Sequence, residues 1–142
     1  MDLGGKPERL ADYTGKGKWT VVMFWAADCR VCNAEMGHYI QFGQDHQDKV
    51  SMLGISLDGQ AGLDAARAFI KRHAVPFPNL VGEPVTVATL YQTLTHHTWV
   101  GTPSFLVYNP KGELIGAQEG AIPPALIVKF INDNTPPASP PK

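Results

Sequence analysis

The two cysteines of this chain lie three residues apart, at the point where a predicted strand gives way to a predicted helix. The strand is the β-branched and aromatic run of residues 19–25, which ends in Trp25, and the helix covers residues 30–47. Cys29 and Cys32 therefore lie at a helix start, where the helix dipole and free backbone N–H groups favour a thiolate. Two thiols at this spacing can close a small disulfide ring and reopen it, so the pair predicts a redox dithiol.

Composition argues against a purely structural role for the cysteine pair. Two cysteines alone cannot form a structural zinc site, which takes about four ligands, and a disulfide between positions i and i+3 constrains too little chain to stabilise a fold much. The net charge of −1 gives no reason to expect a nucleic acid or an anionic membrane as a partner. No apolar run approaches the roughly 18 residues of a membrane-spanning helix, and the first residues are too polar for a signal peptide.

Hydrophobic patterning predicts a single α/β domain over residues 1–134. After the first strand and helix, the pattern predicts a strand at 50–57, a helix at 62–73, a short strand at 80–81, a helix at 85–94, a hairpin of strands at 104–108 and 113–119, and a helix at 123–133. Strands joined through helices pair in parallel and the hairpin is antiparallel, so we expect a mixed central sheet flanked by helices. Residues 135–142 hold four prolines and are expected to form a disordered tail or linker.

Four short motifs accompany the predicted elements. They are Phe24-Trp25-Ala26 before the cysteine pair, Glu35-Met36 after it, Gly101-Thr102-Pro103 leading into a strand, and the turn of residues 109–113 with Gly120 ending the hairpin. Together they resemble the thioredoxin superfamily, and within it the bacterial TlpA/ResA/DsbE-like thiol–disulfide oxidoreductases. The resemblance implies a thioredoxin-like fold with a TlpA-type βα insertion between the second and third main strands, in residues 59–95.

The resemblance also implies roles for the residues of the site. Cys29 would be the attacking nucleophile and Cys32 the more deeply placed resolving thiol, although an inert or metal-binding pair is the alternative. Pro103 would be a cis-proline against the pair, and the backbone of Thr102 would pair with a substrate peptide; a trans-proline that begins an edge strand is the alternative. Trp25 would pack beneath the site, or simply belong to the core.

Asp58 is the candidate for moving a proton. It follows the second strand, and the carboxyl ends of strands gather active-site groups in α/β sheets. A carboxylate there could take the proton of Cys32, and TlpA/ResA-like proteins often place an acid at about this position. A turn or helix-cap residue in the pair Asp58-Gly59 is the alternative, and Glu83 is a weaker candidate for the same role.

The neighbours of the nucleophile depart from the family's pattern. Asp28 replaces the usual aromatic residue, Arg30-Val31 replaces Gly-Pro or Pro-Pro between the cysteines, and Gly37 replaces a proline. A cation favours the thiolate of Cys29 and a carboxylate opposes it, so Arg30 and Asp28 have opposite effects. Two solvated charges with little effect are the alternative.

The implied function is that of a thiol–disulfide oxidoreductase that exchanges electrons with protein dithiols and disulfides and needs no cofactor beyond its own cysteines. The resemblance further implies a monomeric, periplasmic or extracytoplasmic reductase, in cytochrome c maturation or a related pathway, with a membrane thiol–disulfide donor among its partners.

Two alternative functions stay open. His96 and His97 could join the cysteines in a copper metallochaperone, although such proteins usually carry CxxxC, or the chain could be a non-catalytic recognition domain of a larger protein. In each of these cases, Trp99 would belong either to an apolar surface for the partner or to the core.

Overall fold

The computed structural model describes residues 1–135, so the predicted tail lies outside the described residues from position 136 onward. The elements follow the predicted order. They are the 3₁₀ turn η1 (Leu10–Tyr13), β1 (Trp19–Trp25), α1 (Arg30–Asp45), β2 (Val50–Ser56), α2 (Leu63–His73), β3 (Asn79–Val81), α3 (Pro84–Thr95), β4 (Ser104–Tyr108), β5 (Leu114–Glu119) and α4 (Pro124–Asp133). Within residues 1–135, none of the helices has the length and the apolar sequence of a membrane-spanning segment.

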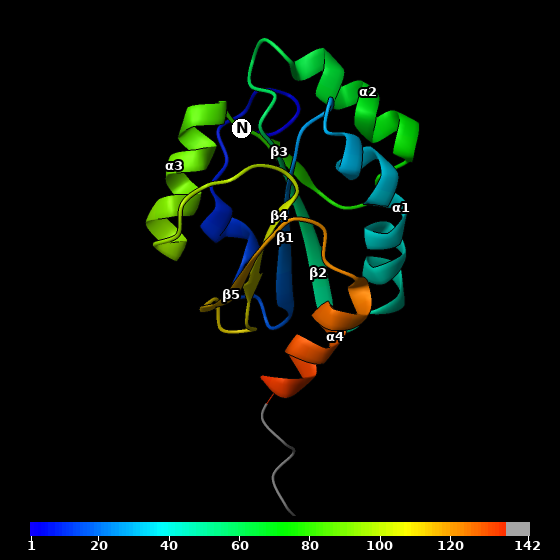
Figure 1. The fold of residues 1–142 in the computed structure, drawn as a ribbon, viewed down its shortest axis with the longest axis vertical. Helices are drawn as coiled ribbons and strands as arrows, with labels where there is room; N and C mark the ends of the chain where they lie inside the picture. The colour runs from blue at the N-terminus through cyan, green and yellow to red at the C-terminus, as the bar shows by residue number, and fades with distance from the viewer. Residues whose placement is uncertain (136–142) are drawn as a thin grey trace, which may run out of the picture.

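The five strands form one mixed sheet in the order β3-β2-β1-β4-β5 (Figure 1). β3, β2 and β1 run parallel, whereas β4 is antiparallel to β1 and β5 is antiparallel to β4. β1 and β2 end level, with Trp25 opposite Ser56, and β4 begins with Ser104 opposite Phe24. The end of β1, the end of β2 and the start of β4 therefore meet at one edge of the sheet, and the predicted mixed sheet is confirmed.

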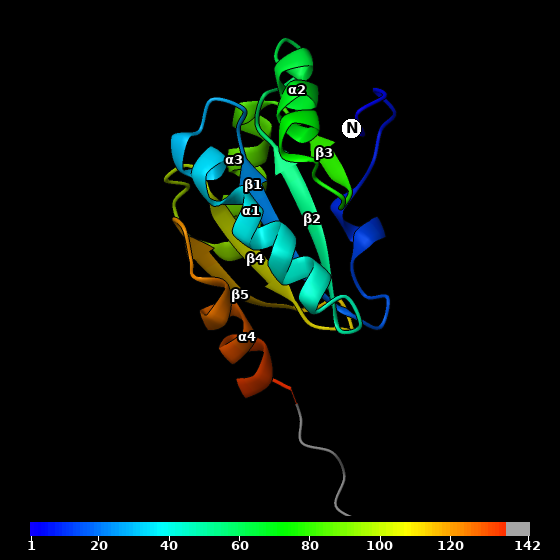
Figure 2. The ribbon, with the colours of Figure 1, turned by 90° about the vertical axis from the view of Figure 1, so that its right-hand side faces the viewer.

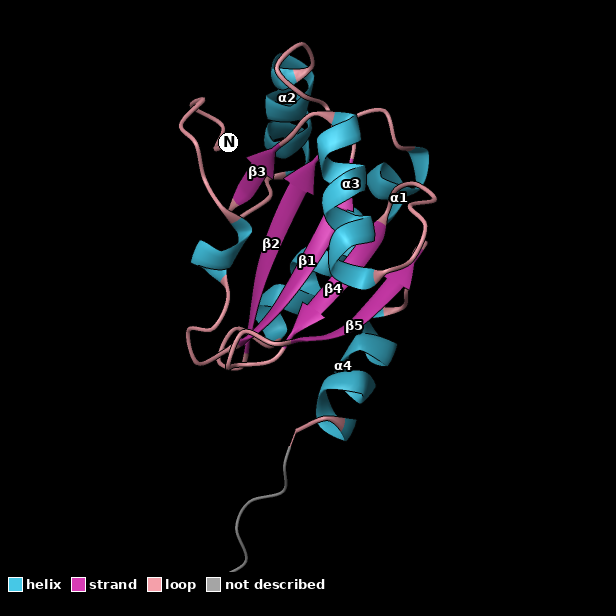
Figure 3. Ribbon diagram, turned by 90° about the vertical axis from the view of Figure 1, so that its left-hand side faces the viewer, coloured by secondary structure: helices cyan, strands magenta, loops and turns pink. Residues whose placement is uncertain are grey.

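Helices cover both faces of this sheet, as predicted. α1 lies across one face, with α2 and α4 on the same side (Figure 2), and α3 lies across the other (Figure 3). β1 supplies both cores, because successive side chains of a strand point to opposite faces. Val21 and Met23 pack with residues of α1, α2 and α4, whereas Val22 and Phe24 pack with residues of α3. Every residue of β1 is buried, so the central strand is held from both sides.

The segment between β2 and β4 contains α2, β3 and α3. α2 ends at His73, and Ala74 follows in the left-handed region with a φ of 51°. Its last turn holds Lys71, Arg72 and His73, and cations are favoured at the C-terminal end of a helix. β3 extends the sheet as a parallel edge strand beside β2. That this segment is a TlpA-type insertion stays a prediction.

Candidate redox site

Cys29 and Cys32 form a disulfide at the start of α1. Cys29 is the N-cap residue, and its sulfur accepts a hydrogen bond from the backbone N–H of Cys32 at 3.1 Å. The two side chains differ in exposure, since Cys29 is half-buried and Cys32 is fully buried in the core beneath α1. Cys29 is therefore the more accessible residue of the pair, which agrees with exchange that begins at Cys29.

The loop that joins β1 to α1 presents Cys29. We call residues 26–29 the redox loop. The backbone N–H of Cys29 donates to the carbonyl of Ala26 at 3.1 Å, which closes a tight turn. The redox loop begins directly after Trp25, the last residue of the fully buried β1, so its starting point is fixed by the core.

Asp58 lies beside the redox loop rather than in an isolated turn. Its carboxylate accepts a hydrogen bond from the backbone N–H of Ala27 at 3.0 Å and another from the hydroxyl of Ser56 at 2.5 Å. The level ends of β1 and β2 make this contact possible. No hydrogen bond within residues 1–135 joins Asp58 to a cysteine. The structure thus adds a loop-holding contact for Asp58, and its role in proton transfer stays a prediction.

Asn33 also contacts the redox loop, although no motif of the sequence points to it. Its side-chain amide donates to the carbonyl oxygens of Ala27 at 3.1 Å and Cys29 at 2.9 Å. The amide oxygen accepts from Arg72 at 2.7 Å and His73 at 2.9 Å. An asparagine within the first turn of a helix is a weak local signal, because this residue type often hydrogen-bonds to nearby backbone.

The Thr102–Pro103 peptide bond is cis in the structure. Pro103 is buried and Thr102 is half-buried. Because Ser104 lies opposite Phe24, near the end of β1, this proline lies at the sheet edge from which the redox loop leaves. The side chain of Ser104 donates to the carbonyl of Gly101 at 2.6 Å and holds the turn around Pro103. Contact between Pro103 and the cysteines, and the substrate-binding role of Thr102, stay predictions.

Trp25 is fully buried in the same core as Cys32. Its ring stacks on Phe69 of α2 with the centroids 4.2 Å apart. Its indole N–H donates to the side-chain oxygen of Asn79 on β3 at 2.9 Å. This contact needs a glycine at position 54, since a Cβ atom there would overlap the Asn79 oxygen. Trp25 therefore belongs to the core and ties α2 and β3 to the strand that leads to the site.

The charged candidates near the site are mostly solvated. Asp28 and Arg30 are exposed, and neither forms an ion pair within residues 1–135. Glu83 is exposed, and its carboxylate accepts from the backbone N–H of Gln60 at 2.9 Å. Its contact is with the loop before α2, so the geometry gives Glu83 no direct place at the cysteines.

Trp99 and the two neighbouring histidines lie on the α3 side of the sheet. Trp99 is half-buried and makes edge-to-face contacts with Phe24 and Tyr91, at centroid distances of 5.7 and 5.2 Å. Both of these partners are buried residues of the core. His96 and His97 are exposed. In the described part of the chain, no group of three or more His, Cys, Asp or Glu side chains is placed to hold a metal ion.

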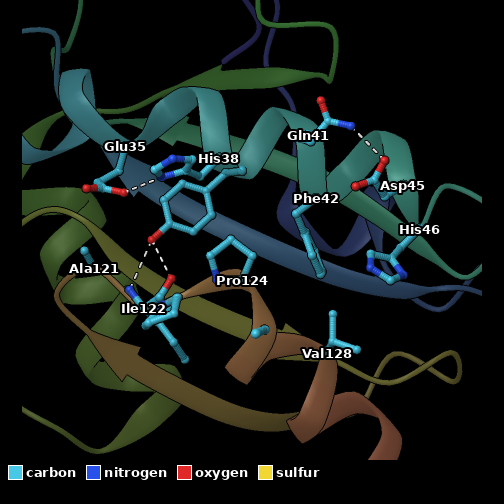
Figure 4. Close-up of a pocket in the computed structure, with 13 residues that line it drawn as sticks. Glu35, His38, Gln41, Phe42, Asp45, His46, Ala121, Ile122, Pro124 and Val128 are labelled. Atoms are coloured by element: carbon cyan, nitrogen blue, oxygen red, sulfur yellow. Dashed lines mark hydrogen bonds and ion pairs between the residues drawn. The ribbon is translucent and has the colours of Figure 1, made fainter.

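A cleft of about 660 Å³ lies between α1 and the start of α4 (Figure 4). Within the cleft, the Tyr39 hydroxyl of α1 binds the backbone of Ile122, which precedes α4. The hydroxyl donates to the carbonyl of Ile122 at 2.8 Å and accepts from its N–H at 3.1 Å. Burial is the main cause that raises the pKa of Tyr39. Glu35, part of the motif after the cysteines, lines the cleft and pairs with His38 at 2.7 Å. Neither cysteine lines this cleft, which is therefore separate from the disulfide.

The sequence is similar to those of known proteins. The model of the AhpC/TSA family matches residues 1–117. The thiol-disulfide oxidoreductase ResA of Bacillus subtilis (strain 168) is 25% identical over 132 residues, which cover 92% of this chain and 68% of the relative.

Solved structures resemble the whole fold. One is a thiol:disulfide interchange protein of the thioredoxin family from Chlorobium tepidum TLS, with a TM-score of 0.75 and 21% identity over 94% of this chain and 89% of that one. Another is a secreted Mycobacterium tuberculosis disulfide oxidoreductase homologous to E. coli DsbE, with a TM-score of 0.71 and 22% identity over 94% of this chain and 92% of that one. These likenesses confirm the predicted thioredoxin-like fold.

Proposed function

The chain belongs to the AhpC/TSA family and is a thioredoxin-like thiol–disulfide oxidoreductase, and we propose that it works as an extracytoplasmic reductase of protein disulfides through Cys29 and Cys32. The observation that carries this proposal is the disulfide at the start of α1, with Cys29 half-buried and Cys32 fully buried in the core. A nucleophile must reach its partner, whereas a resolving thiol need only reach the nucleophile.

In the first step, the Cys29 thiolate of the reduced protein attacks one sulfur of a partner's disulfide. The partner's S–S bond breaks, its second sulfur leaves as a thiolate, and a mixed disulfide joins Cys29 to the partner. The N-terminal end of α1 supports the attacking thiolate, because the N–H of Cys32 already points at the Cys29 sulfur. Arg30 and Asp28 modulate this thiolate with opposite signs, each weakened by exposure to solvent.

In the second step, the Cys32 thiolate attacks the Cys29 sulfur of the mixed disulfide. The bond to the partner breaks, the partner's first sulfur also leaves as a thiolate, and the Cys29–Cys32 disulfide forms, so two electrons have passed to the partner, whose thiolates take protons from the solvent. Cys32 must lose its proton before this attack. We propose that the carboxylate of Asp58 accepts that proton. Asp58 is half-buried and is hydrogen-bonded to Ala27 of the redox loop.

The partner is a protein whose disulfide reaches the edge of the sheet where the redox loop leaves. In this proposal Thr102 offers its backbone to an extended segment of the partner, and Pro103 is expected to lie against the cysteine pair. The position of β4 beside the end of β1 supports this docking site.

The oxidised protein is returned to the dithiol by a membrane thiol–disulfide donor, and it works as a monomer. The extracytoplasmic place is supported by the DsbE homologue of Mycobacterium tuberculosis, which is described as secreted. Cytochrome c maturation, or a pathway with the same need for reduced cysteines, is the process that we propose it serves.

A redox titration tests the direction of electron flow. The oxidised protein is equilibrated in dithiothreitol and glutathione buffers, and its two states are separated by alkylation and mass spectrometry. We expect a reduction potential closer to the value of about −270 mV for thioredoxin than to the value of about −120 mV for DsbA. A value near that of DsbA would make the protein an oxidant, and thiols that never interconvert would end the redox proposal altogether.

A further inference from the structure

Asn33 links the redox loop to the end of α2 through a single side chain. It follows Cys32 in the first turn of α1 and is half-buried. Its amide nitrogen donates to the carbonyls of Ala27 at 3.1 Å and Cys29 at 2.9 Å. Its amide oxygen accepts from Nη2 of Arg72 at 2.7 Å and Nε2 of His73 at 2.9 Å.

These four hydrogen bonds use the full capacity of the amide, which has two N–H donors and two acceptor lone pairs. The neighbours also fix its orientation. A flipped amide would set its NH2 group against the Arg72 guanidinium, which has no acceptor, and its oxygen against two carbonyl oxygens. Since the amide oxygen only accepts, the Nε2 atom of His73 must carry the hydrogen.

The two partners on α2 both contact the ring of the buried Phe69. The guanidinium of Arg72 lies over the Phe69 ring, 5.6 Å from its centroid, and the His73 ring lies 4.4 Å from the same ring. Phe69 stacks in turn on Trp25, the residue that precedes the redox loop. The amide of Asn33 therefore connects the loop to two α2 side chains that both contact the Phe69 ring, the exposed Arg72 and the half-buried His73.

The redox loop is thus bound on both sides of its backbone. Asp58 accepts the N–H of Ala27, and Asn33 donates to the carbonyls of Ala27 and Cys29. A backbone held in one conformation has less freedom to lose when the disulfide ring closes. Holding reacting groups in place also raises the effective concentration of one thiol at the other.

We propose that Asn33 is a positioning residue of the redox reaction, which holds the redox loop in the conformation that closes the Cys29–Cys32 disulfide and is itself held by Arg72 and His73. This role rests on the proposed thiol–disulfide exchange. It makes the oxidised form, more than the reduced form, depend on the amide of Asn33.

The test compares Asn33→Leu, which keeps the size of the side chain and removes all four hydrogen bonds, with the unaltered protein. The equilibrium constant for forming the disulfide in glutathione buffers should fall about 3- to 10-fold, the effect of about one net hydrogen bond. A tenfold change corresponds to 29.6 mV for a two-electron couple, so the potential should become about 15–30 mV less negative. Asn132→Leu, at an exposed asparagine of α4, is the matched control and should leave the constant unchanged.

Thermal unfolding of both redox forms separates positioning from a general loss of stability. Positioning predicts that Asn33→Leu lowers the melting temperature of the oxidised form more than that of the reduced form. Equal losses in the two forms, with an unchanged or increased equilibrium constant, would overturn the inference.

A second variant keeps the test open if Asn33→Leu does not fold. His73→Leu removes one of the two bonds to the amide oxygen and should shift the constant in the same direction, by about twofold. An unchanged constant in that variant would count against the inference. If the unaltered protein itself fails to equilibrate with glutathione, the proposed function fails, which is a different result.

Discussion

Asp58→Asn separates two roles that the Asp58 carboxylate can have. The carboxylate holds the N–H of Ala27 at 3.0 Å and the hydroxyl of Ser56 at 2.5 Å. An asparagine can keep both contacts, because both are made to Oδ2 of the carboxylate and an amide oxygen in that position can accept from the N–H of Ala27 and from the hydroxyl of Ser56. A charge-assisted hydrogen bond worth about 1.5–3 kcal/mol becomes a neutral one worth about 0.5–1.5 kcal/mol. We therefore expect the free energy of unfolding to fall by only about 1 kcal/mol.

The kinetic effect of the same change should be larger if Asp58 takes the proton of Cys32. An amide cannot act as that base, so resolution of the mixed disulfide should slow by about 10-fold or more, on the low side of general-base effects. The first attack by Cys29 should stay nearly unchanged, because the redox loop keeps its contact. Stopped-flow measurement of mixed-disulfide formation and release gives the two rates separately.

Asp58→Ala completes the comparison. It removes the base and also leaves the N–H of Ala27 without its partner, which costs about 1–3 kcal/mol if no water replaces the carboxylate. Resolution rates equal to those of the unaltered protein in Asp58→Asn would refute the base role and leave Asp58 as a residue that holds the loop. Slower attack by Cys29 in Asp58→Ala, but not in Asp58→Asn, would show that the carboxylate also holds the loop.

Four other substitutions test the site and its support. Cys29→Ser should abolish exchange, whereas Cys32→Ser should trap mixed disulfides with partners, as seen on non-reducing gels; faster alkylation of Cys32 than of Cys29 would reverse the assignment. Gly54→Ala should lower the free energy of unfolding by about 3 kcal/mol or more in urea titrations. The added methyl group would overlap the side chain of Asn79 and break its buried hydrogen bond with Trp25. A loss below about 1 kcal/mol would contradict this packing. Burial, and then the adjacent Arg72, lower the pKa of His73 below 6.5. The contribution of His73 to the free energy of unfolding should therefore be full above about pH 6.5 and fall as the pH drops through the lower folded pKa. His73→Gln should flatten this pH dependence in urea titrations, and an unchanged slope would refute the prediction.

The sequence predicted the strands better than the contacts at the site. β1 at residues 19–25 and β4 at residues 104–108 have the predicted bounds, because β-branched and aromatic runs bounded by polar or turn residues define them locally. α1 ends at Asp45, earlier than the predicted residue 47. The sequence did not show this end, because the polar stretch after Asp45 contains no glycine or proline to mark it.

The contacts that shape the redox loop could not be predicted in the same way. The hydrogen-bonded residues Asp58 and Ala27 are 31 positions apart in the sequence, and Asn33 and His73 are 40 positions apart. Neither pair follows a helical or strand period, so only the packing of α2 and the level ends of β1 and β2 bring them together. The cysteine pair, in contrast, was predictable because its spacing and its place after a strand are local.

The place of β1 in the sheet bears on how the molecule opens. Its alternate side chains belong to the cores on both faces, and hydrogen-bonded strands flank it on both sides. Neither core can open alone without exposing this strand, so its amide protons should exchange with deuterated solvent only when the whole domain unfolds. Because the redox loop starts where β1 ends, the difference in exchange of these amides between the oxidised and reduced proteins measures how much the disulfide stabilises the domain.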